Sequence, residues 1–225
     1  MAFEELPAPQ AKLWEFHPVS ETRATELAGA FGLPPLVARV LAGRNLPDLD
    51  AVRCFLDPRL DSLQDPFLLR DMDVAVGRIA AAVERGERIA VYGDYDADGL
   101  TATALLVRCF EWLGHPVDFY IPHRLREGYG MSIEGVETLA SRGVRFIVTV
   151  DNGIGCIEEV RRASALGIDV VVCDHHQPGP ALPEALAVVD PMRTDCTYPF
   201  KTLAGVGVAF KLAHALCKRF DCNPS

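Results

Sequence analysis

Clusters of residues, most of them aspartate or histidine, follow three short apolar runs of this 225-residue sequence. They are Asp94, Asp96 and Asp98 after the first run, Asp151 and Asn152 after the second, and Asp174, His175 and His176 after the third. Alternating carboxylates in one turn repel each other unless cations neutralise them. Ligands that are mostly carboxylate with some imidazole favour Mn2+ or Mg2+ over Zn2+. Two such ions can activate water and stabilise the leaving oxygen of a phosphate ester, so the pattern predicts metal-dependent phosphoester chemistry.

Parts of this pattern have simpler explanations. A single Asp after a strand commonly caps the next helix, which stabilises the helix by about 1 kcal/mol. The run from Asp94 to Gly99 also matches the opening of a calcium-binding loop, but the twelfth position of that loop, which requires Glu, is Leu105. In an extended segment the adjacent His175 and His176 point to opposite sides, so one can bind a metal while the other faces the substrate or supports a ligand.

Two further segments are candidate phosphate contacts. Arg124 or Arg126 can pair with a phosphate, and Tyr129 offers a hydroxyl or a stacking face, as in single-strand binding sites. The alternative is a solvated turn. Gly205 and Gly207 precede a final helix and could admit a phosphate at its N-terminus, although close helix packing explains them equally simply.

These residues need a scaffold that brings the ends of the apolar runs together. Short β-branched runs alternate with helical segments, which predicts a doubly wound α/β fold with a parallel sheet of about five strands and helices on both faces. Ligands bind at the carboxyl ends of such strands. The expected strands are 89–92, 117–121, 146–150, 170–173 and 187–189, and the expected helices are 71–86, 100–113, 132–142, 156–166 and one ending near residue 219.

Composition narrows the class of protein. Residues 1–70 carry short helical stretches separated by prolines and are expected to form a helical lead-in, whereas residues 71–225 are expected to form the catalytic domain.

No apolar run is long enough to cross a bilayer and the N-terminus does not resemble a signal peptide, so we expect a cytoplasmic protein without membrane partners. The seven cysteines form no Cys-x-x-Cys pair, which argues against a zinc ribbon. The net charge of -9 excludes nucleic-acid binding by bulk electrostatics alone.

The motifs resemble those of the DHH phosphoesterase superfamily, whose name describes Asp174-His175-His176, and within it the RecJ single-stranded-DNA-specific exonucleases. The resemblance covers nearly the whole chain as the N-terminal part of that family. The matching segments are VYGDYDADGLTATALL from residue 91, IPHRLREGYGMS from 121, VTVDNGI from 148, VVVCDHHQPG from 170, LAGVGVAFKL from 203, and FLDP and DPFLLRDMD from 55 and 65.

The resemblance implies a role for each matching residue. The metal ligands would be Asp96, Asp98, Asp151, His175 and the first acidic position, Asp94. The catalytic residues would be His176, Asp98 and Asp151, supported by Asp174 and Asn152. The family implies hydrolysis of single-stranded DNA from 5′ to 3′ with two Mn2+ or Mg2+ ions, in recombination and repair, beside a single-strand-binding protein and a repair helicase.

In this family a further metal-binding aspartate, a DHH-associated domain and an OB-fold domain follow the last helix. Their absence predicts weaker metal binding, little processivity and reduced or absent activity. Two alternatives remain: a DHH phosphoesterase for short oligonucleotides or nucleotides, and a catalytically silent DHH scaffold in a replication or repair complex.

Overall fold

The structure, a computed structural model, describes residues 17–44 and 46–221. Contacts divide the chain into two compact units, residues 1–63 and 64–225. The division falls earlier than the expected boundary at residue 70. The reason is that Leu69 lies in the core of the larger unit and the short 3-10 helix η2 (Pro66–Leu68) contacts helices of that unit.

The smaller unit contains the expected proline-separated helices. Ser20 and Asp48 act as N-caps, accepting hydrogen bonds from the backbone N–H groups of Arg23 and Ala51. Its elements are α1 (Glu21–Phe31), α2 (Pro35–Ala42), α3 (Leu49–Leu56) and the 3-10 helix η1 (Leu60–Ser62). Its core consists of Leu27, Ala38, Leu41 and Val52.

The larger unit is built on a five-stranded sheet with the order β2-β1-β3-β4-β5, and every neighbouring pair is parallel. β1 and β3 are buried at every position, which is typical of strands covered on both faces. The predicted parallel α/β fold is confirmed. The strands are β1 (Ile89–Tyr92), β2 (Asp118–Tyr120), β3 (Phe146–Thr149), β4 (Asp169–Cys173) and β5 (Ala187–Val189).

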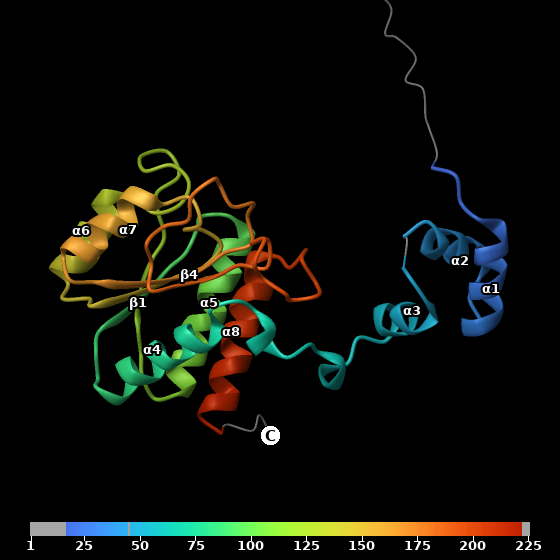
Figure 1. Ribbon diagram of the computed structural model, residues 1–225, viewed down its shortest axis with the longest axis horizontal. Helices are drawn as coiled ribbons and strands as arrows, with labels where there is room; N and C mark the ends of the chain where they lie inside the picture. Colours follow the sequence, from blue (N-terminus) through green and yellow to red (C-terminus); the bar gives the residue numbers. More distant parts are fainter. Residues whose placement is uncertain (1–16, 45, 222–225) are drawn as a thin grey trace, which may run out of the picture. The chain divides into compact units, whose positions relative to one another are not determined.

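Helices cover both faces of this sheet (Figure 1). α6 and α7 pack together against one face, and α4, α5 and α8 pack against the other. Of the described helices, none is long and apolar enough to span a membrane. The helices are α4 (Met72–Glu84), α5 (Ala97–Trp112), α6 (Ile133–Ser141), α7 (Ile157–Ala165) and α8 (Gly205–Arg219).

The order of the strands creates a switch point between β1 and β3. The chain leaves β1 toward β2 on one side and later enters β3 on the other side. The loops that follow these two strands therefore diverge and leave a crevice at the carboxyl edge of the sheet. Asp94 follows β1 and Asp151 follows β3, so both candidate ligands flank this switch point.

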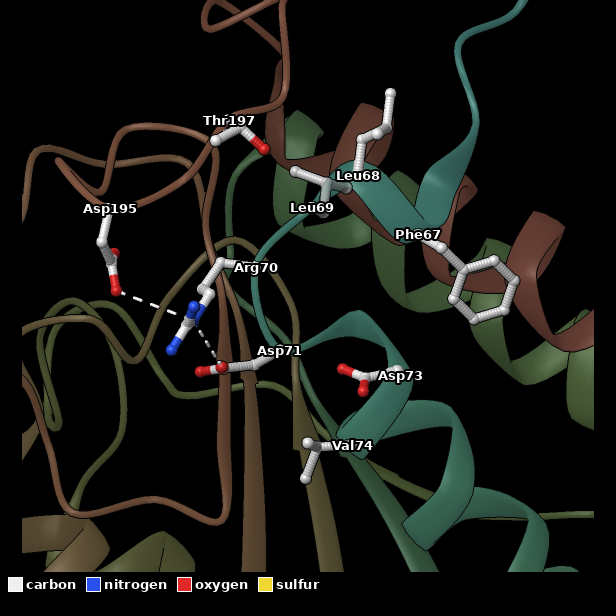
Figure 2. Close-up of a pocket in the computed structure, with 9 residues that line it drawn as sticks. All are labelled: Phe67, Leu68, Leu69, Arg70, Asp71, Asp73, Val74, Asp195 and Thr197. Atoms are coloured by element: carbon white, nitrogen blue, oxygen red, sulfur yellow. Dashed lines mark ion pairs between the residues drawn. The ribbon is translucent and has the colours of Figure 1, made fainter.

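A charged cluster covers the outer edge of β5. Asp71 Oδ2 accepts hydrogen bonds from the Val188 N–H (3.3 Å) and from Arg193 Nη1 (2.6 Å). In the adjacent pocket, Figure 2 shows the Arg70 guanidinium between the carboxylates of Asp71 and Asp195, with which it forms ion pairs. Arg193 also donates to the Val188 carbonyl, so both outward backbone groups of Val188 in β5 are paired, which is one way in which proteins protect an edge strand.

Candidate metal and active site

Asp94 is buried in the turn that follows β1. Gly99 makes this position possible, because a Cβ atom at residue 99 would lie 2.7 Å from the Asp94 Cα atom. The backbone N–H groups of Tyr95, Asp96 and Gly130 approach the Asp94 carboxylate and favour its ionised form, but among the described residues none meets strict hydrogen-bond geometry at either oxygen. Burial accordingly raises the pKa of this carboxyl group. A buried, unpaired carboxylate of this kind is costly unless a cation or a proton compensates it.

Asp96 and Asp98 both accept backbone hydrogen bonds. Asp96 caps α5 by accepting from the N–H groups of Asp98 (2.8 Å) and Gly99 (3.0 Å), so the helix begins at Ala97 rather than at the expected residue 100. Asp98 accepts from the first two N–H groups of α8, with 2.7 Å from Gly205 N to Oδ2 and 2.7 Å from Val206 N to Oδ1. Asp98 therefore anchors the start of α8 beside the site.

Asp151 lies at the centre of the carboxyl edge. Its backbone has φ 63°, a left-handed conformation that Asp tolerates better than most residues. Oδ1 of Asp151 is buried without a hydrogen-bond partner among the described residues, and Nε2 of His175 lies 3.0 Å from it. Burial, followed by the nearby Asp98 and Asp96, raises the pKa of Asp151 to about 7. A bound cation would reverse this effect, because it stabilises the ionised carboxylate.

Asp174 orients the second histidine. Its Oδ2 accepts from the Ile154 N–H (2.9 Å), and its Oδ1 accepts from the His175 N–H (2.7 Å) and lies 2.7 Å from Nδ1 of His176. The contact with Asp174 raises the pKa of His176. The Tyr129 hydroxyl donates to the backbone carbonyl of Asp151 (2.9 Å) and lies against the His176 ring. His176 is thus held between the carboxylate of Asp174 and the hydroxyl of Tyr129.

Two groups of side chains could each hold a metal ion, and they share one member. Within each group the potential ligand atoms lie within 4.8 Å of one another. The groups are Asp94, Asp96 and Asp151, and Asp151, His175 and His176. Carboxylate and imidazole donors with unpaired buried oxygens fit a hard divalent cation such as Mn2+ or Mg2+. Asp98 is in neither group, although its Oδ2 lies 3.6 Å from Nε2 of His175, a member of the second group.

Several predicted residues play supporting parts here. Asn152 donates through Nδ2 to the carbonyls of Tyr92 (3.2 Å) and Val150 (2.9 Å), which ties the ends of β1 and β3 together. Gly205 lies against Asp151, where an added Cβ atom would be 2.5 Å from Oδ1. The close-packing alternative therefore describes Gly205, because the N–H groups that could meet a phosphate already donate to Asp98. A Cβ atom at Gly207 would likewise meet Leu203.

The two candidate arginines are both exposed, but only one has a contact in the site. The guanidinium of Arg124 lies over the ring of Tyr95, 5.2 Å from its centroid. Arg126 forms a turn through its N–H, which donates to the His123 carbonyl. Neither arginine forms an ion pair with another described residue.

Sequence reasoning missed two residues of this edge. Asp190 follows β5 as Asp174 follows β4; it is buried, and burial raises its pKa to about 7. The signal was available, because Asp190 also follows an apolar run. Tyr95 lies between two candidate ligands, and its contact with Arg124 depends on a loop far along the chain, so the local sequence carries no signal for it.

The sequence profile described as "DHH family, N-terminal domain" matches residues 88–224. The chain belongs to the DHH family. All of the candidate ligands lie inside the matched DHH domain, and the triplet of the family's name is Asp174-His175-His176, in which the acid holds the second histidine.

Known members of the DHH family extend this result. The single-stranded-DNA-specific exonuclease RecJ of Bacillus subtilis (strain 168) is 44% identical over 203 residues, which make up 90% of this chain and 26% of that protein. Crystal structures of RecJ from Thermus thermophilus in complex with Mn2+ and with Mg2+ align with TM-scores of 0.70 and 0.55, at 34% and 29% identity. These alignments cover 90% of this chain, and 28% and 24% of the solved chains. This chain therefore spans about a quarter of the length of these relatives and matches their N-terminal part.

Proposed function

We propose that this DHH domain hydrolyses phosphodiester bonds of single-stranded DNA from the 5′ end with divalent metal ions. The observation that carries the proposal is the pair of ligand groups that share Asp151. Asp94 and Asp151 keep buried oxygens unpaired in the described structure, as expected of side chains that bind cations. Two Mn2+ or Mg2+ ions would fit, one held by Asp94, Asp96 and Asp151 and the other by Asp151 and His175, with His176 kept free of metal as a proton donor.

The chain's own residues prepare the proton transfer. We assign the Nδ1 proton of His176 to its 2.7 Å contact with Asp174, so that Nε2, which lies 3.2 Å from the Tyr129 hydroxyl, would serve the reacting group. The raised pKa of His176 favours the protonated ring, so this residue would donate a proton to the leaving oxygen. The metal ions, when bound, would supply an activated water and stabilise the charge that develops on the leaving oxygen.

The relatives and the surface at the acidic edge both support single-stranded DNA as the substrate. The RecJ relatives are named single-stranded-DNA-specific exonucleases. Arg124, with no acidic partner among the described residues, is a cation that can pair with a DNA phosphate. A role in recombination and repair and contacts with a single-strand-binding protein and a helicase remain predictions from the resemblance. Action in the cytoplasm remains a prediction from the hydropathy pattern of the sequence.

The proposal predicts Mn2+-dependent release of nucleotides from single-stranded DNA labelled at the 5′ end. Asp151→Asn is the matched control, since Asn tolerates the left-handed backbone of residue 151 but carries no charge. We expect this variant to lose at least about 100-fold in rate, because a ligand shared by two ions is removed. Equal release by both proteins would contradict the proposal. Cleavage of dinucleotides but not of longer DNA would favour a nuclease of short oligonucleotides, and Mn2+ binding without cleavage would favour a scaffold.

A further inference from the structure

The loop that carries Arg124 is held in place by Glu127. Its carboxylate accepts hydrogen bonds from the His123 N–H, the Tyr120 hydroxyl and the Ser132 hydroxyl, each at 2.7 Å. The one acidic side chain of this loop is therefore engaged with the loop itself. It is not available to neutralise Arg124, which forms no ion pair with the described residues.

The partner of Arg124 is an aromatic ring. Its guanidinium carbon lies 5.2 Å from the centroid of Tyr95, which is a cation–π distance. A ring can cover one face of a guanidinium, whereas the N–H donors of that group point outward in its plane. Arg124 therefore keeps donors for a ligand while its position is restricted.

Tyr95 connects this contact to the candidate metal site. Tyr95 stands between Asp94 and Asp96, two members of one candidate metal group. A shift of the turn that holds these ligands would also move the ring under Arg124. A cation held beside carboxylates in this way suits a DNA phosphate next to the one that meets the metal ions.

We infer that Tyr95 is a positioning residue that holds the guanidinium of Arg124 at the mouth of the acidic edge to bind a phosphate of single-stranded DNA. The inference rests on the proposed function for the identity of the ligand. It assigns the effect to the ring of Tyr95 and not to its hydroxyl group.

The test is a double-mutant cycle on the affinity for a DNA oligonucleotide labelled at the 3′ end, measured by fluorescence anisotropy with Ca2+ in place of Mn2+ and with the oligonucleotide checked to be intact afterwards. Tyr95→Leu should weaken binding about threefold and Arg124→Ala about tenfold. The double variant should bind no more weakly than Arg124→Ala, because Tyr95 acts through Arg124. Tyr95→Phe retains the ring and should bind as the unmodified chain does.

A small substrate separates positioning from damage to the metal site. Bis(p-nitrophenyl) phosphate is a phosphodiester with no neighbouring phosphate, so its hydrolysis should be equal in Tyr95→Leu and the unmodified chain. Additive losses in the double variant, or unchanged DNA affinity in Tyr95→Leu, would overturn the inference. A loss of hydrolysis in Tyr95→Leu with unchanged DNA affinity would overturn it as well. If the unmodified chain hydrolyses neither substrate, the proposed function fails, and the binding cycle still decides the role of Tyr95.

Discussion

The aspartates at the carboxyl edge differ in what their oxygens contact. Asp98 and Asp174 accept hydrogen bonds from backbone N–H groups, whereas Asp94 and Asp151 retain buried oxygens without a partner among the described residues. A carboxylate oxygen that accepts one hydrogen bond still has a lone pair for a cation, but a buried oxygen without a partner is costly unless it is compensated. The need for a cation is therefore greatest at Asp94 and Asp151, and Asp98 combines its predicted metal role with the anchoring of α8.

Asp190 permits a prediction of stability against pH. Its pKa is raised to about 7 by burial, and one oxygen accepts a hydrogen bond from the Met192 N–H (2.7 Å) while the other has no partner among the described residues. Because the folded state holds a proton that the unfolded state releases above pH 4, this residue lowers stability as the pH rises from about 4 to 7. Asp190→Asn should therefore raise the free energy of unfolding by about 2 kcal/mol at pH 8.

At pH 5 the stability gain of Asp190→Asn should be clearly smaller than at pH 8, because the loss of stability begins near pH 4 and is complete only near pH 7. Urea denaturation of both proteins at the two pH values measures this difference, and effects of other groups cancel in the comparison. A stability gain of the same size at both pH values would contradict the account of Asp190.

At the scale of elements, the start of α8 depends on two contacts of one glycine. Its first residue, Gly205, donates to Asp98 and lies too close to Asp151 to carry a side chain. Gly205→Ala should therefore lower the midpoint of thermal unfolding and reduce Mn2+-dependent activity. The control is Gly77→Ala in α4, where nothing lies within 4 Å of an added Cβ atom, so that this variant should gain about 0.5 to 1 kcal/mol.

Differential scanning calorimetry with and without Mn2+ compares the two glycine variants. The structure predicts opposite signs, because both substitutions improve helix propensity but only one collides with a candidate ligand. A stabilised and active Gly205→Ala protein would show that α8 does not need this close approach.

The elements themselves could be predicted well from local patterns. The apolar β-branched runs predicted all five strands, and the prolines of the N-terminal part separated its short helices as expected. What local patterns could not predict were contacts across long sequence separations, such as Asp98 with α8 and Tyr95 with Arg124. For the same reason the sequence predicted that Asp98 lies at the carboxyl edge, but not that both of its oxygens accept backbone hydrogen bonds.

At the scale of the whole molecule, the negative net charge is explained in part by the candidate metal site. A net charge of -9 would repel DNA, but part of it lies at an edge where cations would neutralise it. Metal binding would then reduce the repulsion and place positive charge where the DNA backbone must approach. The chain also spans about a quarter of the length of its RecJ relatives, so a much larger surface accompanies this domain in those proteins.

The most direct test of the account is the number of Mn2+ ions bound, measured by isothermal titration calorimetry on the unmodified chain, Asp151→Asn, Asp94→Asn and the control Asp73→Asn. Asp73 is exposed and lies outside both metal groups. We expect two ions for the unmodified chain and the control, with the affinity for both weakened about tenfold or more in Asp151→Asn and for one in Asp94→Asn. Two ions bound by Asp151→Asn with unchanged affinity would contradict the shared-ligand site.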